Sequence, residues 1–258
     1  MDVLDINSLV DHHKKILNVN NYPYGHCTTK KFLPEDMIKS ISSSFRFPDQ
    51  IYSSSDVLFQ KTKKALNDYN LFPSEIKKIV DYLNSKNFTN ILEDKFKINN
   101  LVADPSLFGG GMHESKNGGY LKIHSDFRYI RNRKLKRILN LLVYLNDNWD
   151  EKWGGAIELW DQKMKNNFVK VFPKINHAAI FRTDTESNHG FPDPITCPKS
   201  IGRKSLAIYY YINDNSLFRR TKYFYARWKR RPGIDEPKFG DNRNFLERFK
   251  NSFLFRFK

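Results

Sequence analysis

The chain has 258 residues, and its 44 Lys and Arg residues against 28 Asp and Glu residues give a net charge of +16 at neutral pH. This length is ample for one large domain, and the 21 Phe and 13 Tyr residues need a core or a ligand to cover them. Two cysteines, Cys27 and Cys197, are too few for a disulfide framework. No apolar run approaches the roughly 18 residues of a membrane span, and the acidic start does not resemble a signal peptide. We therefore expect a soluble, cytoplasmic protein.

The first 100 residues are expected to be mainly helical and to support the rest of the chain. In residues 73–83 the apolar side chains recur at helical spacing after a proline and near an acidic residue, which predicts a helix. Two further helices are expected, one near residues 56–70 and one over 34–42. His12 and His13 would diverge by about 100° on a helix, so we interpret them as surface histidines and not as a metal-binding pair.

From about residue 101 the pattern changes to short strands separated by turn residues. Each run is rich in aromatic or β-branched residues and is bounded by Gly, Pro, Asn or Asp. The expected strands cover residues 120–124, 138–146, 156–160, 168–172, 177–182 and 204–213. At least six short strands with no long helix between them predict an α+β fold: an antiparallel jelly roll, or double-stranded β-helix, with the N-terminal helices packed on one sheet.

No repeat or low-complexity linker divides the chain, so one compact unit is expected. We interpret it as a helical support region (1–100), a jelly-roll core (101–225) and a basic, aromatic C-terminal extension (226–258). Residues 215–258 carry 13 basic and 4 acidic groups, an excess of nine out of sixteen for the whole chain. This charge favours an acidic or anionic partner, although it could equally serve only solubility.

The strand 120–124 ends in a histidine that is followed by a carboxylate two positions later. Because side chains alternate along an extended chain, His124 and Asp126 point to the same side. They are two of the three ligands of a two-histidine, one-carboxylate site for non-haem Fe(II). His189 is the candidate for the third ligand, because the 63 residues after Asp126 give room for four strands that return the chain beside His124 in an antiparallel double sheet.

Arg203 opens the run 204–213, and a charged residue that leads into a buried strand needs a partner. Guanidinium binds a carboxylate through two parallel hydrogen bonds, so a carboxylate ligand is expected. In the run 138–146, Asn140 and Tyr144 share one face while the other face is strongly apolar, which indicates a lined pocket, with a plain core position as the alternative for Tyr144.

Four other aromatic or histidine positions are interpreted as structural. His113 is interpreted as a loop histidine, with a place at the substrate mouth as the alternative. Trp149, Trp153 and Trp160 are expected in the core or at its rim, with stacking on a substrate as the alternative.

The motifs occur in one order: Gly-Tyr-x-x-x-His-x-Asp over 119–126, Tyr-Leu-Asn-x-x-Trp over 144–149, Trp-Gly-Gly-Ala-Ile-Glu-Leu over 153–159, then His189, and then Arg203 before a tyrosine-rich strand. This order resembles the Fe(II)- and 2-oxoglutarate-dependent dioxygenases, and the nearest branch looks like the prolyl 4-hydroxylase-like catalytic domain. The resemblance covers about residues 101–225.

The resemblance implies a role for each matching residue. His124, Asp126 and His189 would bind Fe(II), and Arg203 would pair with the distal carboxylate of 2-oxoglutarate. Tyr144 would donate a hydrogen bond to that same carboxylate. Asn140, which shares the face of Tyr144, is expected to line the cosubstrate pocket.

The chemistry implied is oxidation of a C–H bond. Three protein ligands leave three positions on an octahedral iron, two for 2-oxoglutarate and one for O2, and the cosubstrate is converted to succinate and carbon dioxide. The carboxylate at Asp126 favours hydroxylation, because halogenating relatives have a small residue there. The substrate would be a residue in a protein, slightly favoured by the positive charge, or a small molecule, and an acidic or anionic one would suit that charge.

Two alternatives come from other classes of protein. The first is a non-catalytic jelly-roll module that binds nucleic acid or another anionic surface through its tail, where Tyr223, Tyr225 and Trp228 are interleaved with Arg and Lys. It has no need of the triad together with Arg203 and predicts no turnover of 2-oxoglutarate. The second, a metal-binding jelly roll without redox chemistry, leaves Arg203 and Tyr144 unexplained. The sequence predicts no oligomeric state.

Overall fold

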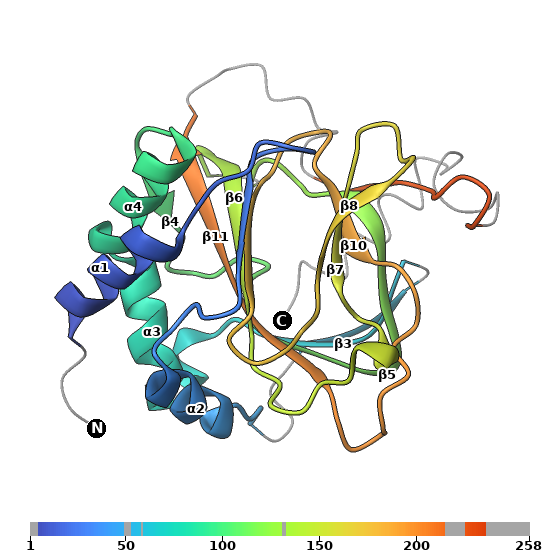
Figure 1. The fold of residues 1–258 in the computed structure, drawn as a ribbon, viewed down its shortest axis with the longest axis horizontal. Coiled ribbons are helices and arrows are strands. Elements are labelled where there is room, and N and C mark those ends of the chain that lie inside the picture. Colours follow the sequence, from blue (N-terminus) through green and yellow to red (C-terminus); the bar gives the residue numbers. More distant parts are fainter. Residues whose placement is uncertain (1–4, 49–52, 58, 131–132, 215–224, 236–258) are drawn as a thin grey trace.

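The computed structural model describes residues 5–48, 53–57, 59–130, 133–214 and 225–235. Its strands form one antiparallel path in the order β1–β9–β6–β11–β5–β10–β7–β8, with β4, β3 with β2, and β12 attached beside it. The path folds back on itself, so that β7, β8 and β10 face β6 and β11 across the interior, and helices α1–α4 lie on the outer side of β6 and β11 (Figure 1). This is the predicted jelly roll with helices on one sheet.

Most of the predicted strands are confirmed, with ends that shift by at most three residues. They are β6 (Leu135–Tyr144), β7 (Ile157–Trp160), β8 (Asn167–Val171), β9 (Ala178–Arg182) and β11 (Arg203–Asn213). The run 120–124 is the last part of a longer strand, β5 (Gly111–Ser125). The strands not predicted are β1 (His26–Thr29), β4 (Leu101–Ala103), β10 (Asn188–Phe191), β12 (Arg227–Trp228) and two strands within residues 53–66 that are described below. The sequence Glu151–Trp153 forms a 3-10 turn.

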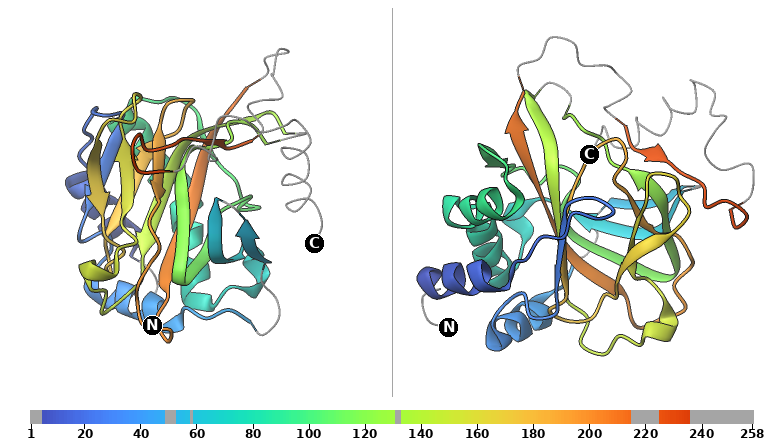
Figure 2. Two further views of the ribbon diagram at one scale, coloured as in Figure 1. Left: turned by 90° about the vertical axis from the view of Figure 1, so that its right-hand side faces the viewer. Right: turned by 45° about the horizontal axis from the view of Figure 1, so that its top comes forward.

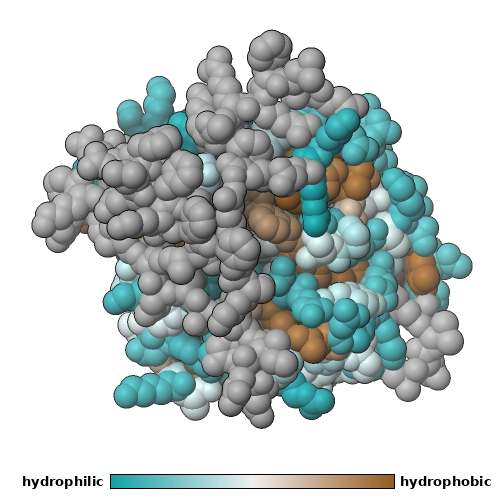
Figure 3. Space-filling view, turned by 180° about the vertical axis from the view of Figure 1, so that it is seen from behind, coloured by the Kyte–Doolittle hydropathy of each residue, from teal (hydrophilic) through white to brown (hydrophobic). Residues whose placement is uncertain are grey.

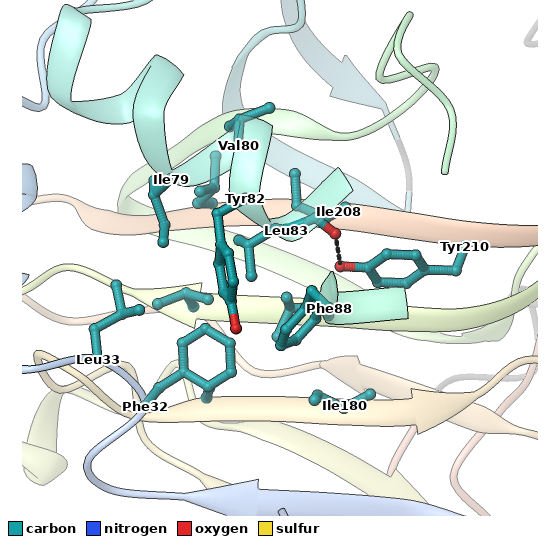
Figure 4. Packing of buried hydrophobic residues seen from close by; sticks show 14 of the residues in the cluster. Phe32, Leu33, Ile79, Val80, Tyr82, Leu83, Phe88, Ile180, Ile208 and Tyr210 are labelled. Atoms are coloured by element: carbon teal, nitrogen blue, oxygen red, sulfur yellow. Dashed lines mark hydrogen bonds between the residues drawn. The ribbon is translucent and has the colours of Figure 1, made fainter. Parts of the chain in front are cut away.

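The four helices are α1 (Ile6–Ile16), α2 (Glu35–Ser44), α3 (Ser74–Asn84) and α4 (Lys86–Phe96), and α2 and α3 confirm two of the predicted helices. Their apolar faces pack on the outer face of the sheet, where Leu83 and Phe88 lie beside Ile208 and Tyr210 (Figure 4). The Tyr210 hydroxyl donates to the carbonyl oxygen of Leu83 at 3.0 Å, which satisfies the one polar atom of that buried ring.

The helix predicted near residues 56–70 is wrong. The chain there forms a hairpin of β2 (Ser53–Val57) and β3 (Gln60–Leu66), followed by a short 3-10 turn over Tyr69–Leu71. Strand β3 pairs with β5 along its length, and Figure 2 shows the hairpin beside that strand. The unpaired backbone groups of β5 are satisfied by this pairing, and that tertiary gain outweighs the helix propensity of the Lys- and Leu-containing sequence.

The interpretation of His13 as a surface residue is also wrong. His13 is fully buried on the inner side of α1, among the rings of Phe32, Tyr82 and Phe88. Its Nδ1 lies 2.9 Å from the Tyr82 hydroxyl and 2.8 Å from the carbonyl oxygen of Leu9. Burial lowers the pKa of His13 to about 4, and the hydrogen bond to Leu9 opposes that shift.

Several smaller expectations hold. Cys27 and Cys197 are free and buried, and the side chains of Trp149 and Trp160 are buried while Trp153 packs edge-on against Trp149. No helix in the described ranges has the length and apolar character needed to cross a membrane. On the face opposite to that of Figure 1, apolar side chains reach the surface in patches bordered by hydrophilic ones (Figure 3).

Candidate active site

Strand β5 positions the site because its first and last parts pair with different strands. On one side, its first part pairs with β11 and its last part with β10. On the other side, β3 pairs with it as far as Leu121, and β12 pairs with His124 and Ser125. The change follows Gly118, whose φ of +77° favours glycine, and Gly119, where a Cβ would lie 2.3 Å from the Thr62 hydroxyl oxygen. The glycine pair therefore lets one strand carry residues to both walls of the interior.

The three predicted metal ligands lie together. His189 on β10 is paired directly with His124 on β5, and Asp126 follows at the end of β5. Nε2 of His124 lies 3.4 Å from Oδ1 of Asp126, and Nε2 of His189 lies 3.3 Å from Oδ2. All three ligand atoms lie within 4.8 Å of one another.

Both histidines have their ring orientation set by the backbone. Nδ1 of His124 lies 2.9 Å from the carbonyl oxygen of Lys122, and Nδ1 of His189 lies 2.9 Å from that of Ser187. Each Nδ1–H donates to its carbonyl, so the lone pair of each Nε2 is directed toward the carboxylate. Two neutral imidazoles and one carboxylate converging in this way fit a divalent first-row metal such as Fe(II).

The carboxylate of Asp126 is held by two residues of β6. Nδ2 of Asn140 donates to Oδ2 at 2.7 Å, Nη2 of Arg137 lies 3.0 Å from the same oxygen, and Nε of Arg137 donates to the Asn140 side-chain oxygen at 2.6 Å. Burial alone would raise the pKa of Asp126, but the charge of Arg137 holds that pKa well below its ordinary value. Asp126 is therefore a carboxylate in the folded protein.

Asn140 and Tyr144 share the interior face of β6, as the alternation predicted, but their contacts differ. Asn140 contacts Asp126, and Tyr144 contacts Arg203. Within the described residues, the Asn140 side chain thus acts on the metal ligand, and its place in the cosubstrate pocket stays a prediction.

Arg203 begins β11 and is buried, with 5% of its surface exposed. Its Nη2 donates to the Tyr144 hydroxyl at 2.9 Å and its Nε donates to the carbonyl oxygen of Gly155 at 2.7 Å. The guanidinium lies 4.1 Å from the centroid of the Phe191 ring, which comes from the opposite wall. Arg203 and Tyr144 therefore lie inside the barrel, on the wall that faces the triad.

Among the described residues, no carboxylate pairs with Arg203. Burial lowers the pKa of Arg203, and Tyr144 opposes that shift, but a guanidinium stays protonated in either case. Burial raises the pKa of Tyr144 and so keeps its hydroxyl proton, which is free for donation because Arg203 uses the oxygen as an acceptor. A buried cation beside a donor phenol fits the distal carboxylate of 2-oxoglutarate.

Sequence reasoning missed Arg137. Simple alternation places Arg137 on the apolar face with Leu139, yet the pairing of β6 with β11 shifts between Tyr210 and Tyr211. This bulge turns Arg137 inward, where its guanidinium lies 3.4 Å from the centroid of the Tyr209 ring. A bulge of this kind leaves no clear signal in one sequence.

His113 was interpreted as a loop residue, and that interpretation is wrong. It lies in β5, buried, opposite Ala65 on one side and Ser205 on the other, with its Nε2 3.1 Å from the carbonyl oxygen of Gly110. Burial first, and then the nearby charge of Lys63, hold the pKa of His113 well below its ordinary value. His113 is therefore a neutral residue of the interior wall.

The described part of the C-terminal extension covers the metal-binding strand. In β12, Arg227 and Trp228 pair with Ser125 and His124. The Trp228 ring stacks on Phe59 at 4.6 Å between centroids and lies 4.9 Å from the ring of His124. The proposed base-stacking residue Trp228 thus has ring partners within the domain, and Tyr223 lies outside the described residues.

Comparisons with known proteins agree with this geometry. The sequence model described as the 2OG-Fe(II) oxygenase superfamily matches residues 110–211, the span that includes the triad, Tyr144 and Arg203. No curated protein sequence matches the chain.

Three solved structures with a similar fold are prolyl hydroxylases. A Pseudomonas putida prolyl-4-hydroxylase has a TM-score of 0.51 and 13% identity, over 82% of this chain and 100% of its own. A Trichoplax adhaerens prolyl hydroxylase, in complex with a hypoxia inducible factor peptide fragment, has a TM-score of 0.51 and 16% identity, over 83% and 94%. A Phytophthora capsici prolyl 4-hydroxylase has a TM-score of 0.50 and 15% identity, over 84% and 68%. At these identities the similarity is one of fold.

Proposed function

We propose that this chain hydroxylates an unactivated C–H bond. It belongs to the 2OG-Fe(II) oxygenase superfamily and is a 2-oxoglutarate-dependent dioxygenase with a prolyl 4-hydroxylase-like fold. His124, Asp126 and His189 would hold the iron. Arg203 and Tyr144 would bind the distal carboxylate of 2-oxoglutarate. The observation that carries the proposal is the placement of Arg203 and Tyr144 on the wall opposite a converging two-histidine, one-carboxylate triad. The buried guanidinium of Arg203 has no ion-pair partner among the described residues.

The protein residues have separable tasks in this proposal. The carbonyl oxygens of Lys122 and Ser187 fix the two imidazoles, so both Nε2 atoms are ready to coordinate without a change of tautomer. Arg137 and Asn140 keep the Asp126 carboxylate ionised and in place. Arg203 supplies a fixed charge in a water-poor interior, where it discriminates strongly for an anionic cosubstrate.

Bound iron, with 2-oxoglutarate and O2, supplies the oxidising chemistry of this class, in which 2-oxoglutarate is converted to succinate and carbon dioxide. Asp126 occupies the carboxylate position of the triad, and this supports hydroxylation over halogenation, because a small residue at that position would be needed to admit a halide. The substrate proposed is a residue in a protein or a small molecule. One fold neighbour is a prolyl hydroxylase with a peptide bound, which supports the former. The cytoplasmic location stays a prediction.

The test is succinate formation from 2-oxoglutarate. The full chain is loaded anaerobically with Fe(II) and 2-oxoglutarate and then exposed to air, because enzymes of this class turn over slowly without their substrate. Succinate from the wild type and none from His124→Ala would support the proposal. If neither protein forms succinate and no visible band appears that depends on both iron and 2-oxoglutarate, the proposal fails.

A further inference from the structure

One row of side chains crosses three neighbouring strands on the interior wall. Ser115 of β5 is paired with Arg203 of β11 on one side and with Lys63 of β3 on the other. Paired residues of antiparallel strands direct their side chains to the same face, so Lys63 shares the interior face with Arg203. Two strand spacings separate their backbones by about 10 Å.

A bulge gives Lys63 this direction. The pairing of β3 with β5 shifts between Lys61 and Lys63, and Thr62 between them has a φ of +53°. Lys61 is exposed, whereas Lys63 is partly buried and its ammonium is near Asp126, Arg137 and Arg203. Burial, opposed by Asp126, lowers the pKa of Lys63 to about 8, so the amine is mostly charged at neutral pH.

Among the described residues, this part of the interior therefore holds three cations, Lys63, Arg137 and Arg203, and one carboxylate, Asp126, near them. Arg137 has Asp126 as its ion-pair partner, and Arg203 would have the distal carboxylate of 2-oxoglutarate. The ammonium of Lys63 has no hydrogen bond or ion pair to any residue in the described part of the chain. A buried cation without a partner is costly, so a site that keeps one is matched to an anionic ligand.

We propose that Lys63 binds a carboxylate of the substrate and thereby makes this enzyme selective for carboxylate-bearing substrates. The inference rests on the proposed function and deepens it. Ser115 leaves room in the row between the two cations, and the partial exposure of Lys63 leaves it within reach of a ligand that enters from solvent.

The hairpin that carries Lys63 is tied to the metal-binding strand at its other end. Phe59 precedes β3 and stacks on Trp228, which contacts the ring of His124. Lys63 and the triad are therefore connected through packed residues of one wall, and a substrate held by Lys63 would lie on the wall that carries His124.

The test measures binding, so it does not depend on turnover. The full chain is loaded with Zn(II) in place of iron and saturated with 2-oxoglutarate, which occupies Arg203. Small N-acetyl amino acids are then titrated calorimetrically, each against its primary amide, and a second set compares short peptides that contain Glu with matched peptides that contain Gln. The first set reports a small-molecule acid and the second an acidic protein segment.

The expected result is that at least one acid binds the wild type about tenfold or more tightly than its amide, which corresponds to about 1.4 kcal/mol. Lys63→Met should abolish this preference, and Lys63→Arg should keep part of it. Lys61→Met is the matched control, because it removes the same charge from an exposed position of the same strand and should leave the preference intact.

Three outcomes would overturn the proposal: no acid binds the wild type at tens of millimolar, the preference survives in Lys63→Met, or Lys63→Met weakens 2-oxoglutarate binding as much as Arg203→Met does. The last would place Lys63 in the cosubstrate site. Failure of the proposed function is distinguishable, because then 2-oxoglutarate would not bind the Zn(II)-loaded wild type at all.

Discussion

Nδ2 of Asn140 lies 2.7 Å from Oδ2 of Asp126, so strand β6 holds the residue that ends the metal-binding strand. Asn140 is in turn oriented by Nε of Arg137, at 2.6 Å. A ligand carboxylate that is held by two fixed donors does not have to be ordered when the metal binds. We therefore expect Asn140 to position Asp126 for metal binding.

Asn140→Ala should weaken metal binding without removing a ligand. We expect the affinity for Mn(II) or Co(II) to fall about 10- to 100-fold, the range found when a partner of a metal ligand is lost. Calorimetric titration of the metal-free protein measures it. Asn166→Ala, at an exposed position, is the control. An unchanged affinity in Asn140→Ala would show that Arg137 alone orients Asp126.

His189→Ala should have the larger effect, because it removes one of the three ligand atoms that converge within 4.8 Å. We expect the metal affinity to fall by more than about 100-fold, beyond the effect of losing a supporting residue. The same titration applies, and His177→Ala, a histidine outside the site, should bind metal like the wild type. Full metal binding by His189→Ala would remove β10 from the site.

Arg203→Met should weaken 2-oxoglutarate binding by about 30-fold or more, since losing one partner of a buried charged pair costs roughly 2 kcal/mol or more. Tyr144→Phe removes one hydrogen bond, so a smaller loss of about two- to tenfold is expected. Both are measured by titrating 2-oxoglutarate into the Zn(II)-loaded protein. Metal affinity should stay unchanged in both variants, and equal 2-oxoglutarate affinity across wild type and variants would contradict the assignment.

His13→Leu should make the protein less sensitive to acid. The folded-state pKa of His13 is about 4, below the ordinary value of 6.5. Above pH 6.5 neither state is protonated, but as the pH falls from 6.5 to 4 the unfolded chain binds a proton that the folded protein excludes, so stability is lost in this window. The loss is about 3 kcal/mol at most.

The measurement for His13 is the urea unfolding free energy of the metal-free protein at pH 7 and pH 4.5. The wild type should lose more stability between these values than His13→Leu does, and the neighbouring variant His12→Leu should behave like the wild type. Equal pH dependence in wild type and His13→Leu would mean that His13 is protonated in the folded state.

Local patterns in the sequence were sufficient for the features that depend on alternation and turn chemistry. The alternation in 138–146 predicted which residues of β6 face the helices and which face the interior, and the spacing of His124 and Asp126 predicted their common side. The proline before α3 and the apolar positions within it predicted that helix. Each of these is decided within a few residues, because side-chain direction repeats every two residues in a strand and every 3.6 in a helix.

Tertiary structure decided which strands pair and which side chains therefore lie near one another. The hairpin β2–β3 forms because β5 offers it a strand edge, and His113 is buried because β3 and β11 flank it. Arg137 and Lys63 face inward because each lies next to a bulge that breaks the two-residue alternation. The sequence by itself determined which side chains are the candidate metal ligands. The charges that surround them were decided by the pairing of strands far apart in the chain, because pairing register is a property of two segments and is absent from either one alone.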